Sequence, residues 1–407
     1  MAWSDISVLR NSRFGTAPTK AELREWLSSI MFGIDESKEA LGVISQWEGY
    51  RPTPLLQLTK LARELDVGII HYKNEAERFN LRSFKALGGA YAVYKLLSQR
   101  VEIETGIASV SIERLLGGEF SEIASKFAIA SATAGNHGRS VAWGASMFGC
   151  PCNIYVHKGV SQARANAIAA FRANIISVDG NYDDSVRIAA RDSEANGWTV
   201  VSDTTYPGYN EIPRLVMTGY SVMFAEILEV LGEARPTHII IPVGVGGLAA
   251  AVVTYFALHC GDECPKFIMV EPEKADCLYQ TALHGVPRRA RGGLGSVMLG
   301  LDCGEVSELA WLVLERLAYA FVLITDEAAV EAMRDLGATR IDGEPIEAGE
   351  CAGAGLAVLR NVKGNPALRD ALGISSSSRI LLIGTEGATD PERRENLLLR
   401  GLEAQMN

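Results

Sequence analysis

The tripeptide Ser83-Phe84-Lys85 places a reactive amine between two regular segments of this chain of 407 residues. A strand-like run, residues 67–72, precedes it, and a helix-like run, residues 86–97, follows it. A lysine at such a turn can be held as a neutral amine by burial and by the positive end of the helix. A neutral lysine can form a Schiff base with an aldehyde cofactor. The alternative is an ordinary surface lysine that opens a helix, because a single lysine carries little information.

Composition narrows the classes of protein that remain. With 407 residues, 48% of them hydrophobic, the chain can fill two cores, so we expect two domains. A net charge of -10 without a long basic run argues against a nucleic-acid partner. The seven cysteines form no CxxC pair and have no histidine cluster beside them, so we expect no metal site. An odd cysteine count, no leader-like N-terminus and no long apolar stretch predict a soluble cytoplasmic protein without a membrane segment.

Short β-branched runs alternate with amphipathic stretches, which predicts an α/β fold with a mainly parallel sheet. The expected strands after the first are residues 127–130, 152–156, 174–178, 199–201, 238–242, 267–270, 320–324 and 379–383. The expected helices are residues 84–97, 138–148, 162–171, 183–196, 215–231, 248–259, 326–336 and 352–362. Residues 102–119 look coil-like, and we expect a loop or an insertion there.

The first of three glycine-bearing turns, residues 131–138, follows an expected strand and opens an expected helix. A strand–turn–helix entry exposes several backbone N–H groups, which suit a carboxylate. Asn136 adds a side chain that can hydrogen-bond a phenolic or carbonyl oxygen. An ordinary capped turn is the alternative.

The second turn, Gly244-Val245-Gly246-Gly247, follows the expected strand 238–242 and opens an apolar helix. Glycines allow backbone amides to close on a phosphate at a helix N-terminus. A rival interpretation is a dinucleotide fingerprint, GxGxxA, which ends at Ala249. Glu271, at the end of the next expected strand, stands where a ribose-binding acid would be expected. From this motif alone, a nicotinamide or flavin enzyme remains open.

The third turn, residues 383–390, follows residues 379–382 of an expected strand and contains Thr385. A hydroxyl at a strand end can hydrogen-bond a ring nitrogen. A polar turn near the C-terminus is the alternative.

These four segments, in this order, resemble the fold-type II pyridoxal-phosphate enzymes, and within that group the diaminopropionate ammonia-lyases. The resemblance runs from about residue 50 to the C-terminus. Its closest stretches are residues 50–55, 77–93, 135–143, 181–184, 203–209, 349–350 and 385–391. A dinucleotide-binding oxidoreductase explains none of the first and third turns or the lysine tripeptide. A non-catalytic binding protein that keeps this fold would be expected to lack Lys85.

The resemblance implies a role for each turn. Lys85 matches the lysine that carries the cofactor, pyridoxal 5'-phosphate. The other cofactor contacts it implies are Asn136 at the 3'-oxygen, Gly244, Val245, Gly246 and Gly247 at the phosphate, and Thr385 near the pyridine nitrogen. The residues implied for the substrate carboxylate are Thr133, Ala134, Gly135, Asn136 and His137.

The architecture implied is a pair of open, twisted, mainly parallel sheets flanked by helices, as in tryptophan synthase β. Residues 1–89 and 203–407 would form a large cofactor-binding domain, and residues 90–202 a small, mobile one. Relatives are commonly homodimers, so we expect the same assembly here.

The activity implied is α,β-elimination on a small L-amino acid with a β leaving group, which yields a 2-oxo acid and ammonia. The first expectation for the substrate is diaminopropionate, with pyruvate and ammonia as products. Asp203 is the candidate for recognising or protonating the leaving amine, and the alternative is that it caps a turn. A serine or threonine dehydratase, or a lyase for another β-substituted amino acid, is the runner-up.

Three positions depart from the family pattern, and the mildest is Cys351, which follows Glu350 where a serine is common. Ala134 stands where ammonia-lyases of this type carry an aspartate, which is thought to take the α-proton of the D-isomer. A methyl group cannot accept a proton, so we expect an L-specific enzyme. Gly384 stands where many relatives place a serine, so Thr385 would have to supply the hydroxyl.

Overall fold

The computed structural model describes residues 6–15, 19–133, 135–260 and 263–406. The chain forms two compact units. The larger unit comprises Pro52–Ser83, Met223–Asn407 and the segment that ends at Ile34. The smaller unit comprises Asp35–Arg51 and Phe84–Val222.

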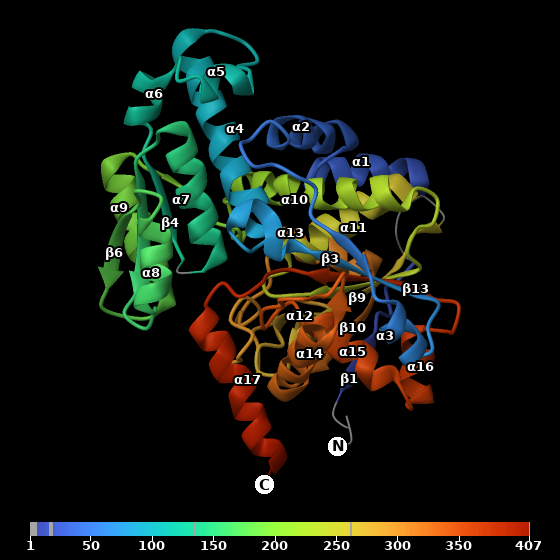
Figure 1. Cartoon of the computed structure of the whole chain (residues 1–407). Helices are drawn as coiled ribbons and strands as arrows, with labels where there is room; N and C mark the ends of the chain where they lie inside the picture. Colours follow the sequence, from blue (N-terminus) through green and yellow to red (C-terminus); the bar gives the residue numbers. More distant parts are fainter. Residues whose placement is uncertain (1–5, 16–18, 134, 261–262, 407) are drawn as a thin grey trace. The chain divides into compact units, whose positions relative to one another are not determined.

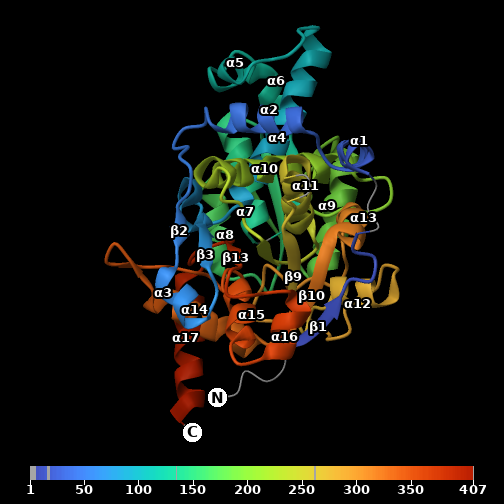
Figure 2. The ribbon, with the colours of Figure 1, turned by 90° about the vertical axis from the view of Figure 1, so that its right-hand side faces the viewer.

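The larger unit is built on a seven-stranded sheet with the order β1-β10-β9-β8-β13-β3-β2. Its strands are β1 (Ser7–Arg10), β2 (Leu55–Gln57), β3 (Ile69–Asn74), β8 (His238–Pro242), β9 (Lys266–Pro272), β10 (Ala318–Ile324) and β13 (Arg379–Gly384). The five inner strands run parallel, and the two edge strands, β1 and β2, pair antiparallel. Figure 2 shows β1, β10 and β9 side by side.

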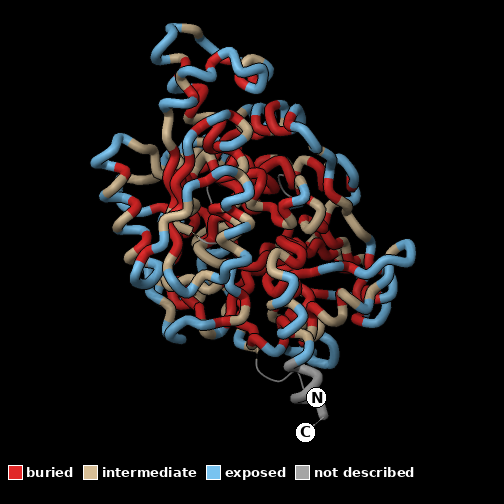
Figure 3. Tube along the Cα trace, turned by 60° about the vertical axis from the view of Figure 1, so that its left-hand side comes forward, coloured by how far each residue is buried: buried red, intermediate tan, exposed pale blue. Residues whose placement is uncertain are grey.

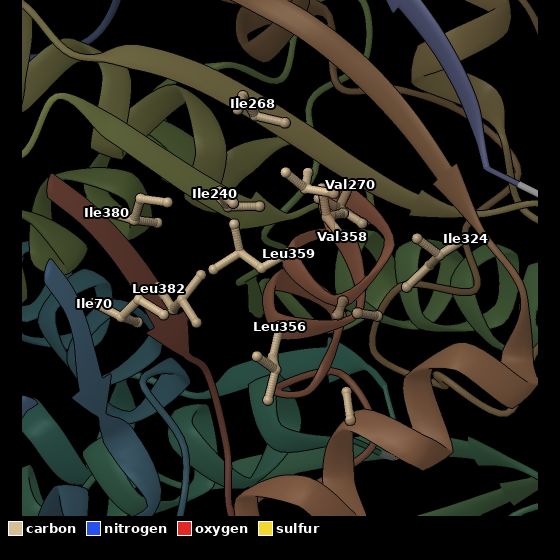
Figure 4. Packing of buried hydrophobic residues seen from close by; sticks show 14 of the residues in the cluster. Ile70, Ile240, Ile268, Val270, Ile324, Leu356, Val358, Leu359, Ile380 and Leu382 are labelled. Carbon is tan, nitrogen blue, oxygen red and sulfur yellow. The ribbon is translucent and has the colours of Figure 1, made fainter. Parts of the chain in front are cut away.

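The inner strands are mostly apolar because helices cover both faces of such a sheet. In β8 and β10 every residue is buried. Figure 4 shows the side chains of Ile70, Ile240 and Leu382, from three neighbouring strands, gathered around Leu356 and Leu359 of α15 (Ala354–Val362). This core fixes the strand ends from which the candidate site residues emerge.

Helices and short segments complete the larger unit. They are α1 (Lys20–Ile30), α3 (Thr59–Glu64), η1 (Glu75–Asn80), α11 (Gly247–Cys260), α12 (Cys277–His284), α13 (Glu308–Leu317), α14 (Asp326–Ala338), β11 (Arg340–Ile341), β12 (Glu344–Pro345), α15, α16 (Pro366–Leu372) and α17 (Pro391–Met406). Buried and exposed positions alternate along the helices of the trace in Figure 3, as expected for amphipathic helices.

The smaller unit contains a four-stranded, all-parallel sheet with the order β6-β5-β4-β7. Its strands are β4 (Ile129–Ala132), β5 (Cys152–His157), β6 (Asn174–Val178) and β7 (Thr199–Val200). The helices are α2 (Ile34–Ile44), α4 (Lys85–Thr105), α5 (Ile112–Leu116), α6 (Ser121–Lys126), α7 (Asn136–Phe148), α8 (Gln162–Ala169), α9 (Tyr182–Asn196) and α10 (Glu211–Leu231), the last of which runs on into the larger unit (Figure 1).

The predicted α/β class with two mainly parallel sheets is confirmed, and the expected strands lie within a few residues of the observed ones. The loop expected as one alternative for residues 102–119 is observed only in part, because two helices occupy portions of that segment. Helix α4 continues through it to Thr105, where Gly106 ends the helix in the left-handed conformation, and α5 follows. Among the described residues, no helix is long and apolar enough to cross a membrane.

Candidate active site

The Lys85 amine forms an ion pair with the carboxylate of Asp203. Lys85 is the first residue of α4, and Asp203 follows β7. The two side chains are 22% and 21% exposed, so the pair is largely shielded but still open to solvent. The sequence-predicted lysine and acid, 118 positions apart, are therefore direct neighbours.

Two neighbouring parallel strands bring a histidine to the same place. β4 pairs with β7, so the turns that follow them emerge at the same edge of the sheet. The Nε2 atom of His137 lies 3.1 Å from the Val201 carbonyl oxygen, which can only accept, so Nε2 carries the proton. The other ring nitrogen, Nδ1, therefore faces Asp203 Oδ2 at 3.9 Å.

The charge state of this cluster follows from its surroundings. Burial by itself would raise the pKa of Asp203, but the neighbouring His137 and Lys85 outweigh burial and hold that pKa well below its ordinary value. Burial lowers the pKa of His137, which is therefore a neutral imidazole at pH 7. An ionised carboxylate facing an amine can bind a cation or orient the amine for proton transfer.

The turn after β4 contains the residues expected to hold a carboxylate. Thr133, Gly135 and Asn136 are half-buried, and the Thr133 Oγ1 atom accepts a hydrogen bond from the Gly135 N–H at 3.3 Å. Asn136 begins α7, so the backbone N–H groups of the first helical turn open here. Ala134 lies outside the described residues.

The glycine turn after β8 has no room for side chains. A Cβ atom on Gly244 would lie 2.8 Å from the Gly300 carbonyl oxygen, and one on Gly246 would lie 2.8 Å from the Ala310 Cβ. Gly246 also has a φ of +99°, which favours glycine. Gly244 and Val245 are half-buried, and Gly247 begins α11. This is the form of turn that cradles a phosphate on backbone N–H groups.

Thr385 follows β13, a direct neighbour of β8 in the sheet. Its side chain is buried, and its Oγ1 atom has no hydrogen-bond partner among the described residues. A buried hydroxyl without a partner at a strand end is available to hydrogen-bond a ligand. A serine at the preceding position, as in many relatives, does not fit, because a Cβ atom on Gly384 would collide with the ring of Tyr72.

The loop that follows β13 and begins with Thr385 is hydrogen-bonded to the segment that precedes Lys85. The Gly387 N–H donates to the Arg82 carbonyl oxygen at 3.0 Å, and Ser83 forms an antiparallel bridge with Glu386. The lysine follows Ser83 by two residues. The residues that follow Thr385 therefore contact the residues that directly precede the lysine-bearing helix.

Glu271, the ribose-binding acid of the rival dinucleotide interpretation, has another task. Its carboxyl group is buried and accepts hydrogen bonds from the Leu278 and Tyr279 N–H groups, both at 2.7 Å. It therefore caps the N-terminus of α12, and its burial raises its pKa to about 8. This buried capping role argues against a ribose-binding role for Glu271.

Sequence reasoning missed Tyr220, which stands on α10 within the smaller unit. Its ring packs against the ring of Phe84 with centroids 4.8 Å apart, and its hydroxyl is buried. A tyrosine in an apolar helix gives no sign in the sequence that its hydroxyl lies at a particular lysine.

The fold and these residues define a cofactor-dependent enzyme: the chain belongs to the family of pyridoxal-phosphate dependent enzymes, whose sequence model matches residues 46–386. The chain is 36% identical to the diaminopropionate ammonia-lyase of Escherichia coli (strain K12) over 382 residues, 93% of this chain and 94% of the relative. It is also 36% identical to the Salmonella typhimurium (strain LT2) enzyme over 375 residues, 90% of this chain and 92% of the relative.

A crystal structure of the Escherichia coli diaminopropionate ammonia-lyase in complex with D-serine superposes with a TM-score of 0.87. The two sequences are 35% identical, and the match covers 98% of both chains. The predicted family and cofactor are confirmed. The residues described here also fit the cofactor, since they offer an amine, a glycine cradle and a buried hydroxyl without a partner.

Proposed function

We propose that this enzyme eliminates the β-substituent of a small L-amino acid and releases a 2-oxo acid and ammonia. The first substrate is 2,3-diaminopropionate, with pyruvate as the oxo acid. The observation that carries the proposal is the ionised Asp203 carboxylate beside the Lys85 amine, because a substrate with a second ammonium group needs such a partner. The relatives at 36% identity that are diaminopropionate ammonia-lyases support it.

The chain would hold the cofactor through groups that differ in chemistry. Lys85 would carry it covalently, the turn from Gly244 to Gly247 would bind its phosphate, and Asn136 and Thr385 would meet its 3'-oxygen and its ring nitrogen. When bound, the cofactor stabilises negative charge on the substrate Cα. A neutral hydroxyl at Thr385, rather than a cation, leaves that ring nitrogen unprotonated.

Lys85 is the proposed base. When its Nζ atom is not bonded to the cofactor, it would take the proton from the substrate Cα. The backbone N–H groups around Thr133, Gly135 and His137 would bind the substrate carboxylate and so turn the Cα–H bond toward Nζ. The neutral His137 contributes no cation to this site.

Asp203 is proposed to bind the β-ammonium of the substrate. A carboxylate whose pKa is held low remains ionised, and an ion pair keeps the opposing amine protonated. The β-nitrogen then leaves as neutral ammonia, which is a far better leaving group than an amide anion. Asp203 therefore recognises the leaving group and holds its proton without having to donate one.

A substrate panel tests the proposal. Purified enzyme should release ammonia and pyruvate from L-2,3-diaminopropionate faster than from L-serine, and K85A should abolish both the turnover and the visible absorbance of the bound cofactor. K95A, which alters another lysine of the same helix, is the control and should retain both. Preferential turnover of L-serine or L-threonine would assign a dehydratase instead.

We further infer a cytoplasmic homodimer. Seven cysteines, all free, suit a reducing compartment. Light scattering of the purified enzyme should give twice the mass of the 43.9 kDa chain, and a monomer mass would contradict the assembly.

A further inference from the structure

The first turn of α4, which begins with Lys85, packs against α10 within the smaller unit. A Cβ atom on Gly88 would lie 2.6 Å from the Val216 carbonyl oxygen, so this contact depends on glycine. Tyr220, one turn further along α10, packs its ring on Phe84. The packing of the two rings holds the buried phenol of Tyr220 against the residue that directly precedes Lys85.

The hydroxyl of Tyr220 has no hydrogen-bond partner of its own among the described residues, and the side chain is 1% exposed. Burial raises the pKa of this hydroxyl, and the charge of the nearby Lys85 amine opposes part of that rise. Because its pKa is raised, the hydroxyl keeps its proton at neutral pH, and that proton is available for donation.

The groups around the Lys85 amine differ in what they can stabilise. The Asp203 carboxylate only accepts hydrogen bonds, so it favours the ammonium form of the lysine. His137, with its proton on Nε2 toward Val201, is neutral. A neutral amine has one lone pair that needs a donor, and the Tyr220 hydroxyl can provide one.

We propose that Tyr220 is a positioning residue whose hydroxyl donates to the lone pair of Lys85 and keeps the freed lysine neutral, aimed and ready to accept the α-proton. Asp203 then favours the protonated form of the lysine, and Tyr220 favours the neutral form. This inference rests on the proposed role of Lys85 as the base.

The pKa of Lys85 can be measured in two independent ways. In Y220F the acidic limb of the kcat profile, which reports groups in the substrate complex, should move to higher pH by about half to one unit, the equivalent of one hydrogen bond. In the full chain freed of cofactor, acetylation of Lys85 by acetic anhydride, followed by mass spectrometry across pH, should show the same rise in its pKa. D203N should shift the labelling profile in the opposite direction.

Phenylalanine keeps the ring that packs on Phe84, and circular dichroism checks the fold of each variant. Y91F makes the same change at another buried tyrosine of the smaller unit and should leave both profiles unmoved. Unchanged Lys85 labelling in Y220F would overturn the role of Tyr220. Retention of the cofactor absorbance in K85A would overturn the role of Lys85 instead, so the two failures are distinguishable.

Discussion

At the scale of single residues, the chemistry depends on which of two opposing effects is larger. Burial alone would raise the pKa of Asp203, and the neighbouring His137 and Lys85 outweigh burial and keep the carboxylate ionised. Glu271 shows the opposite balance: its burial outweighs its backbone N–H partners, and its pKa rises to about 8. The two acids have different tasks because only one of them faces a lysine.

The methyl group of Ala134 gives a stereochemical prediction. The wild-type enzyme should release pyruvate from L-2,3-diaminopropionate roughly 100-fold or more faster than from the D-isomer, because one general base contributes at least that factor. A134D should gain activity on the D-isomer, measured by pyruvate release. A134N cannot accept a proton and should not gain it. Equal turnover of both enantiomers by the wild-type enzyme would contradict the prediction.

The hydroxyl of Thr385 gives a prediction on cofactor affinity. T385V removes it at constant shape, and the Kd for pyridoxal phosphate should rise roughly 3- to 10-fold, as expected for one neutral hydrogen bond. Fluorescence titration of the cofactor-free chain measures this value. Thr254 is matched to Thr385, since its hydroxyl is also buried without a partner among the described residues, and T254V should leave the Kd unchanged. Equal affinities of wild type and T385V would remove Thr385 from the cofactor contacts.

Sequence patterns could single out Lys85, Asp203 and Thr385 because each stands at a turn between a strand and a helix. The partners of these residues could not be predicted in the same way. Tyr220 lies within a 21-residue apolar helix, where a tyrosine is indistinguishable from any core residue. The exclusion of a serine side chain at Gly384 is likewise visible only once the Tyr72 ring is placed beside it.

At the scale of elements, a buried network of charges holds the segment that leads to Lys85. Glu226 of α10 accepts hydrogen bonds from Lys73 of β3 at 2.6 Å and from Arg78 of η1 at 2.7 Å. Arg78 also pairs with Glu75, and all four side chains are at most 2% exposed. Phe79, Asn80 and Arg82 adopt positive φ angles just after this network. Fixed charges thus hold a strained backbone in place.

Removal of Glu226 should lower the stability of the fold, because the buried cations Lys73 and Arg78 each lose one hydrogen-bonding partner. E226A should lower the free energy of unfolding by about 3–5 kcal/mol, measured by urea titration. K126A breaks the exposed pair with Glu122, whose side chains are 71% and 86% exposed, and should change it by less than about 1 kcal/mol. Similar effects of the two variants would show that the buried network does not stabilise the fold.

Helices and strands could be predicted from the sequence where the spacing of the apolar residues and the length of the run indicated the same kind of element. The strands Asn174–Val178 and His238–Pro242 coincide with their predicted bounds, because each is a short β-branched run between polar turns. A loop or an insertion is expected from the sequence at residues 102–119, because charges and a glycine interrupt the apolar pattern there. Helix α4 nevertheless continues to Thr105, because one of its faces is buried. The network around Glu226 spans 153 positions of sequence, from Lys73, and has no local pattern to predict it.

At the scale of the whole molecule, the free energy of unfolding depends on pH, because several buried groups have different pKa values in the folded and unfolded states. Burial lowers the pKa of His71 and His238, so these side chains add stability as pH rises through their unfolded value near 6.5. Glu271 acts in the opposite direction. Its folded pKa of about 8 exceeds its ordinary value of 4.5, so its contribution is present at low pH and is lost as pH rises toward 8.

E271Q separates these opposing effects, since glutamine mimics the protonated acid and does not titrate. From pH 6.5 to 8.5 the wild-type enzyme should lose about 1–2 kcal/mol of stability relative to E271Q, while the histidine contributions cancel in the comparison. Urea midpoints of both proteins across this range measure the difference, which should level off above pH 8. Parallel pH profiles would mean that Glu271 is ionised in the folded protein. The cap of α12 would then be a carboxylate held by its two backbone N–H groups.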